Sequence, residues 1–196
     1  IQKIRFDIQE EYSAYRKTVM QGMIRIVLRF GKNLVRKAID YHDYNTARAV
    51  TESIFQYYVS QEDDSQIQCY HNKYIELEEI CRLEHESKLQ FGKVSSDKKL
   101  DENTRNELIN WLEKAEERLS IESSDFHFFY YKIKLAITQD EEYEEYCERA
   151  IKYFEDLYFN HATYIAIFRN RLKDYRIKKN DISLNMLGLL YSQLQS

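Results

Sequence analysis

The stretch TRNELINWLEKAEERL, residues 104–119, decides the fold class of this chain. Apolar side chains recur in it every three or four residues, at Leu108, Trp111, Leu112, Ala115 and Leu119. This spacing places them on one face of an α-helix, while polar and charged residues cover the other faces. Thr104 and Glu107 stand three residues apart, as in a capping box, so we expect this helix to begin at Thr104.

The same periodicity extends in both directions along the chain, and little in the sequence interrupts it. The 196 residues include no proline and only four glycines, and these are the residues that most disfavour a helix interior. We therefore expect an all-α fold of about eight or nine helices joined by short turns. The expected helices cover residues 2–18, 20–39, 45–60, 66–90, 104–119, 125–137, 141–158, 161–176 and 181–195.

Local signals predict where several of these helices begin or break. Gly22 or Gly31 is expected to kink or divide the stretch 20–39. Side chains that accept hydrogen bonds from backbone N–H groups precede several of the later helices. The candidate N-caps are Asp43 or Asn45, Ser123, Ser124 or Asp125, Thr138 in a capping box with Glu141, and Asn180 or Asp181.

One polar segment suggests a division of the chain. Residues 92–101 are mostly polar and include Gly92, so we expect a linker or a long loop there. It would separate an N-terminal helical half, residues 1–91, from a C-terminal helical half, residues 102–196. A chain of this length also fits a single domain.

The composition is that of a globular protein with its own core. Hydrophobic residues make up 43% and charged residues 32%, with 17 tyrosines, 10 phenylalanines and one tryptophan. The three cysteines, Cys69, Cys81 and Cys147, have no paired spacing, which favours free thiols and a reducing, cytoplasmic location. No apolar run approaches the ~20 residues of a membrane span.

Two segments resemble parts of the tetratricopeptide repeat. In His42-Asp43-Tyr44-Asn45-Thr46-Ala47 a tyrosine precedes an alanine by three residues, as at that repeat's hairpin corner, although His42 stands where glycine is usual. Ala150-Ile151-Lys152-Tyr153-Phe154 is similar to its second helix, and residues 125–158 span about one repeat period. The resemblance implies antiparallel helical hairpins in a repeat-like superhelix that binds peptides. A compact bundle is the alternative.

No pattern typical of catalysis or cofactor binding is present in the sequence. Cys81 and His85 share a helix face, but Cys69 and His71 lie some 12 residues away, about 18 Å along the same helix, so the pairs cannot share a zinc ion. The chain has no Gly-x-Ser-x-Gly elbow and no glycine-rich phosphate loop. We therefore expect no catalytic residue, no metal, no cofactor and no enzymatic activity.

Charge is distributed unevenly along the chain. Residues 1–37 carry a net charge of +6, and the remainder carries −10. Arg25, Arg29, Lys32 and Arg36 form a stripe at helical spacing, and a second group near the C-terminus comprises Arg169, Arg171, Lys173, Arg176, Lys178 and Lys179. Such groups can bind acidic side chains of a peptide, or they can pair within the molecule. Direct binding of nucleic acid is disfavoured because the sequence pI is about 5.8.

These observations favour a non-enzymatic module that binds a protein or peptide, with the sensor or regulatory part of a larger bacterial protein as one form of it. The contact residues expected for this partner are Arg29, Lys32, Arg36, Arg48, Tyr131 and Arg169. Two other classes stay open. One is an oligomeric structural protein that dimerises through its C-terminal helix, which is apolar on nearly all sides. The other is an enzyme whose site is assembled from distant helices.

Overall fold

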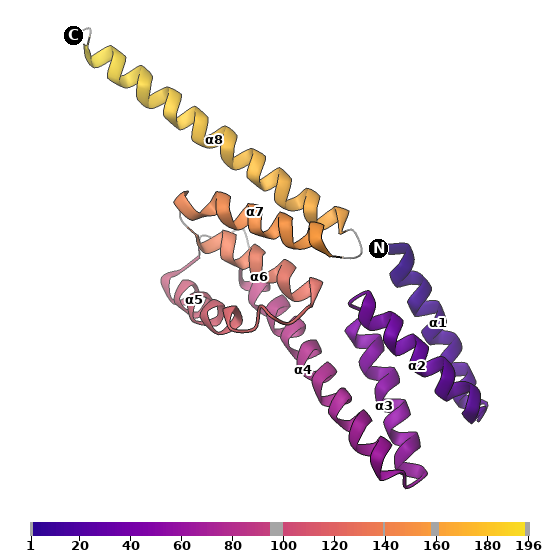
Figure 1. Ribbon diagram of the computed structural model, residues 1–196. Helices are drawn as coiled ribbons and strands as arrows, with labels where there is room; N and C mark the ends of the chain where they lie inside the picture. Colours follow the sequence, from indigo (N-terminus) through magenta and orange to yellow (C-terminus); the bar gives the residue numbers. More distant parts are fainter. Residues whose placement is uncertain (1, 95–99, 139, 158–160, 195–196) are drawn as a thin grey trace.

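The computed structural model describes residues 2–94, 100–138, 140–157 and 161–194. These residues form α-helices and turns and contain no strand, which confirms the all-α prediction. Most consecutive helices pack against each other as antiparallel hairpins, whereas α4 packs on α6 rather than on α5 (Figure 1). The helices are α1 (Gln2–Met20), α2 (Ile24–Asp40), α3 (Tyr44–Ser60), α4 (Asp64–Val94), α5 (Glu102–Glu116), α6 (Ser124–Ile137), α7 (Asp140–Asp156) and α8 (Ala162–Leu194).

The two glycines of the first hairpin have different roles. Gly22 has φ +69° and lies in the turn between α1 and α2, so the stretch 20–39 is divided there. Gly31 lies buried inside α2, where it allows α1 to approach closely. A Cβ at Gly31 would lie 2.9 Å from Cε2 of the Tyr15 ring.

The predicted caps are partly right. Asp43 and Ser123 are the N-caps of α3 and α6, as expected. The prediction that Thr104 begins a helix is wrong, because Asp101 is the N-cap and its carboxylate accepts a hydrogen bond from the Thr104 N–H at 2.8 Å. Thr138 is the C-cap of α6, and its hydroxyl donates to the Lys134 carbonyl oxygen.

Two expected boundaries differ from those of the structure. Asn180 and Asp181 lie inside α8, which runs without a break where we expected two helices, at 161–176 and 181–195. Helix α4 continues through Gly92 to Val94, so the expected linker 92–101 begins with helical residues. Residues 95–99 lie outside the described ranges.

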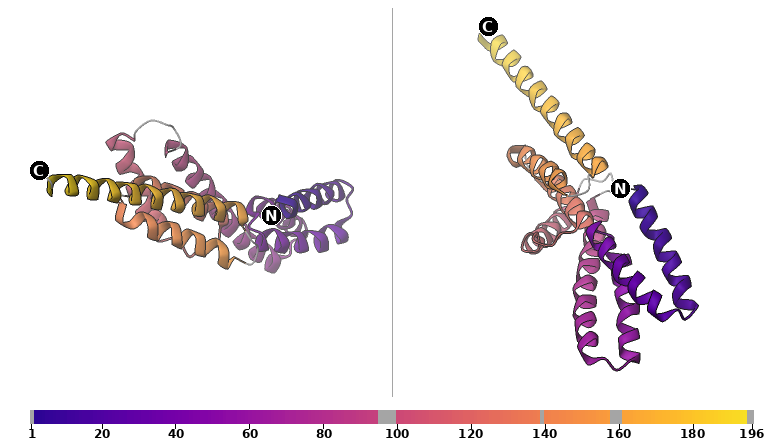
Figure 2. Two further views of the ribbon diagram at one scale, coloured as in Figure 1. Left: turned by 90° about the horizontal axis from the view of Figure 1, so that it is seen from above. Right: turned by 45° about the vertical axis from the view of Figure 1, so that its right-hand side comes forward.

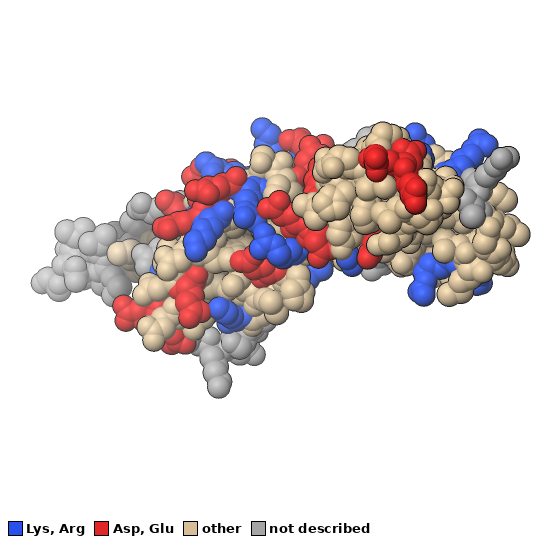
Figure 3. Space-filling view, turned by 90° about the horizontal axis from the view of Figure 1, so that it is seen from below, with Lys and Arg blue, Asp and Glu red and all other residues tan. Residues whose placement is uncertain are grey.

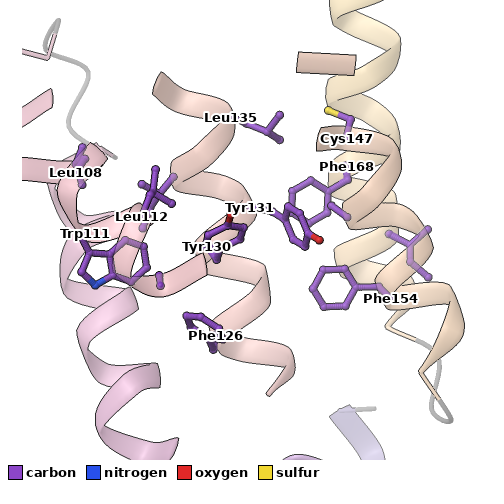
Figure 4. Packing of buried hydrophobic residues seen from close by; sticks show 14 of the residues in the cluster. Leu108, Trp111, Leu112, Phe126, Tyr130, Tyr131, Leu135, Cys147, Phe154 and Phe168 are labelled. Carbon is purple, nitrogen blue, oxygen red and sulfur yellow. The ribbon is translucent and has the colours of Figure 1, made fainter. Parts of the chain in front are cut away.

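The buried apolar side chains form two clusters along the chain. The first fills the space between α1, α2, α3 and the first part of α4, and it includes Tyr15, Leu34, Val50 and Leu77. The second lies between the end of α4 and helices α5 to α8, and aromatic rings dominate it (Figure 4). Helix α4 contributes Leu77 to the first cluster and Leu83 to the second. It therefore joins the two halves of the molecule, as the right-hand view of Figure 2 shows.

Helix α8 is longer than the helix on which it packs. Its first half lies against α7, and the rest extends beyond the body of the molecule (Figure 1). Across the described residues, no helix combines the length and the apolar character that a membrane span requires.

Candidate functional site

The two halves also meet away from α4, at a region that we call the waist. There the turn between α2 and α3 lies against the turn between α5 and α6. The Tyr44 hydroxyl donates a hydrogen bond to the Glu122 carbonyl oxygen. The Ser124 N–H donates to Nδ1 of His42 at 3.0 Å. His42 has φ +55°, a left-handed conformation that is costly for a side chain other than glycine.

A buried carboxylate supports the same region from α4. The Ser123 hydroxyl donates to Oε1 of Glu84 at 2.6 Å and accepts from the Phe126 N–H at 3.2 Å as the helix cap. Both Ser123 and Glu84 are buried. The Glu84 carboxylate thus orients the Ser123 hydroxyl as the cap of α6, so this contact is structural. A nucleophilic serine is instead paired with a base such as histidine.

A second buried histidine lies behind this contact. The His127 ring stacks on Tyr153 with 3.8 Å between ring centroids, and one of its nitrogens lies 3.0 Å from the Ile121 carbonyl oxygen. Its Nδ1 and the Tyr153 hydroxyl have no hydrogen-bond partner among the described residues. Burial lowers the pKa of His127 to about 4, opposed by the hydrogen bond to Ile121, so the ring is neutral at pH 7.

The Tyr44 hydroxyl that bridges the waist is protonated at neutral pH. Burial raises the pKa of Tyr44 well above its ordinary value, and the carboxylates of Glu84 and Glu122 raise this pKa further. The hydroxyl therefore keeps its proton as a hydrogen-bond donor to the Glu122 carbonyl.

Two cavities adjoin this bridge, and together they form a groove at the waist. The first, of about 480 Å³, is lined by Ile39, Tyr44, Lys73, Glu76, Leu77, Glu79, Ile80, Ser120, Ile121 and Glu122. The second, of about 730 Å³, is lined by Ile39, Asp40, His42, Tyr44, Glu122, Tyr153, Asp156 and Leu157. Because Ile39, Tyr44 and Glu122 line both cavities, the Tyr44–Glu122 hydrogen bond forms part of their common wall.

Acidic side chains dominate the charge of this waist groove. Five acidic residues line it, namely Asp40, Glu76, Glu79, Glu122 and Asp156, against one basic residue, Lys73. Glu79 forms an ion pair with Arg118, with 3.6 Å between its Oε1 and Nη1 of Arg118. The other four carboxylates have no ion pair within the described part of the chain. Away from the groove, acidic and basic side chains alternate over the C-terminal half (Figure 3).

The predicted basic contact residues of the first half lie on other surfaces. Arg29 and Arg36 are exposed on α2 and have no ion pair with any described residue. Lys32 lies over the rings of Tyr58 and Tyr70, with its Nζ 5.5 and 5.6 Å from their centroids. A hydrogen bond to Tyr58 is the main cause that raises the pKa of Lys32.

The other three predicted residues are engaged within the fold. Arg48 donates to Glu78 at 3.0 Å. Tyr131 is only 9% exposed and packs against Phe168 in the C-terminal cluster. Arg169 forms an ion pair with Glu155, although its side chain is 63% exposed. None of the six predicted residues lines either cavity of the waist groove.

The cysteines and histidines do not assemble a metal site within the described ranges. All three cysteines are free thiols, as the sequence predicts. Burial is the main cause that raises the pKa of Cys81 and of Cys147 to about 11, so both thiols are protonated at neutral pH.

Sequence reasoning missed the residues of the groove. Asp40 ends α2, Asp156 ends α7, and Glu122 lies in the turn before α6. Each lies near a helix end, and only packing of distant segments brings the three together. The turn His42–Ala47, noted for its resemblance to a repeat corner, was the one local signal near this place.

No family model matches this chain, and neither a curated protein nor a solved structure matches it. The resemblance to the tetratricopeptide repeat therefore stays a prediction.

Proposed function

We propose that this chain is a non-enzymatic module that binds a segment of another polypeptide in the waist groove. The segment would carry lysine or arginine beside apolar side chains. The observation that supports this proposal is the excess of carboxylates without ion pairs around an apolar lining. Ile39, Leu77 and Leu157 supply part of that lining.

The size of the groove suits a few side chains of a peptide. Ligand pockets typically enclose about 300–1,000 Å³, and each of the two cavities falls in that range. Apolar side chains of the segment would cover Ile39, while its cationic groups would face the carboxylates at the rim. Exposed charges of this kind raise the association rate and select the partner more than they tighten binding.

This proposal reverses the charge that the sequence suggested for the partner. The basic stripe on α2 pointed to an acidic peptide, but Arg29, Lys32 and Arg36 do not line the waist groove. A concave surface with apolar lining is a better binding site than an exposed basic helix face, because it removes more apolar surface from water. We therefore propose a cationic partner.

Fluorescence anisotropy with short labelled peptides tests the proposed function. We expect a peptide of alternating lysine and leucine to bind, and one of alternating glutamate and leucine to bind much less. The double variant Asp40→Asn with Asp156→Asn should weaken binding by about two- to thirtyfold, since each lost charge contact contributes about 0.2–1 kcal/mol.

A matched control removes the same charge elsewhere. Glu52→Gln with Glu113→Gln changes two exposed carboxylates that do not line the groove. This control should bind as the wild type does. Equal loss in both double variants, or equal binding of the two peptides, would contradict a specific site at the waist.

A further inference from the structure

The C-terminal part of α8 projects from the body of the molecule. Among the described side chains of α8, Arg176 is the last with ion pairs to α7, at 2.5 Å to Glu144 and 2.9 Å to Glu148. Residues 177–194 then continue the helix for about 27 Å, or five turns. Figures 1 and 2 show no other helix beside this end.

The projecting segment exposes large apolar side chains to solvent. Every residue from Arg176 to Met186 is exposed. Leu184 is 67% exposed and Met186 is 63% exposed, and Ile177 and Ile182 are similarly uncovered. The sequence from Ile182 to Ser196 has no charged residue. Exposed apolar side chains of this size mark a surface for interaction with a partner.

The spacing of the apolar residues identifies one face of this helix as a seam. Ile177, Leu184 and Tyr191 are seven residues apart, and Leu187 and Leu194 each follow one of them by three. This is the a and d pattern of a coiled coil, with Asn180 at the first d position. Ile182 and Met186 fall at f and c, outside the seam.

We propose that α8 pairs with α8 of a second copy in an antiparallel coiled coil along this seam. Beyond the ion-paired Arg176, the segment from Ile177 to Asp181 carries a net charge of +1. A parallel pair would place two such segments together and both protein bodies at one end. An antiparallel pair instead brings each basic segment beside the partner's uncharged helix C-terminus, where the helix dipole is negative. This inference does not depend on the waist groove.

Sedimentation equilibrium of the full chain tests the pairing. We expect a mass that rises from 23.8 kDa towards twice that value with concentration. Leu184→Glu buries a charge in the seam and should weaken the dimer by more than about tenfold. Met186→Glu adds the same charge at a c position and should change it by less than about twofold.

Several outcomes would overturn the proposal. These are a monomer at every concentration, or equal effects of Leu184→Glu and Met186→Glu. Because both positions lie outside the core, circular dichroism should show an intact fold for both variants. Orientation is tested with Asn180→Cys in a Cys69→Ser background under mild oxidation. Antiparallel copies hold the two residues 180 apart, so a disulfide between them would exclude this arrangement.

Discussion

The imidazole of His127 makes the fold sensitive to acid. Its pKa is about 4 in the folded protein, against about 6.5 for an ordinary histidine. The folded state therefore binds this proton less readily than the unfolded state. The contribution of the neutral His127 ring to the free energy of unfolding is complete above about pH 6.5. This contribution falls by about 3 kcal/mol in total as the pH drops towards about 4.

Urea unfolding between about pH 7 and pH 4.5 measures this effect. His127→Gln keeps an N–H donor for the Ile121 carbonyl oxygen but does not titrate, so its free energy of unfolding should fall less with acid. His85→Gln changes an exposed histidine and should follow the wild type. An unchanged acid dependence in His127→Gln would show that His127 is not the group responsible.

At the scale of a helix, Gly31 shows how α1 and α2 approach each other. Gly31→Ala gains helix propensity but places a methyl group 2.9 Å from the Tyr15 ring and 3.1 Å from Ile54. The cost of overpacking at this buried site should exceed the gain in helix propensity. We therefore expect the free energy of unfolding to fall by about 1–2 kcal/mol.

Gly92 provides the matched control inside α4. A Cβ there meets no atom within 4 Å, so Gly92→Ala should be neutral or stabilising by up to about 1 kcal/mol. Thermal unfolding of both variants measures the difference. Equal stability of the two would mean that α1 does not pack closely against Gly31.

Helix positions were predictable from the sequence because apolar periodicity is a local property. The residues at which the helices begin and end were less predictable. Asp101 and Thr104 can both accept a backbone hydrogen bond, and only the structure shows that Asp101 is the cap. In α8, Asn180 and Asp181 looked like a cap, but no proline or glycine stands there to break the helix.

At the scale of the whole molecule, the candidate site could not be read from the sequence. The basic stripe on α2 was conspicuous because its residues are neighbours on one helix. Asp40, Glu122 and Asp156 come from three separate segments, and their proximity follows from the packing of the two halves. Tyr131 similarly looked like a contact residue, although an aromatic ring at helical spacing also suits a core.

Zero-length carbodiimide crosslinking of a lysine–leucine peptide shows where on the protein a cationic segment binds. The reagent joins a carboxylate to an amine in contact with it, and mass spectrometry identifies the joined residues. We predict crosslinks at Asp40, Glu76, Glu122 and Asp156, and none above background at Glu52 or Glu113. Crosslinks spread over all exposed carboxylates, or concentrated away from the waist groove, would contradict the claim that this groove binds a cationic polypeptide.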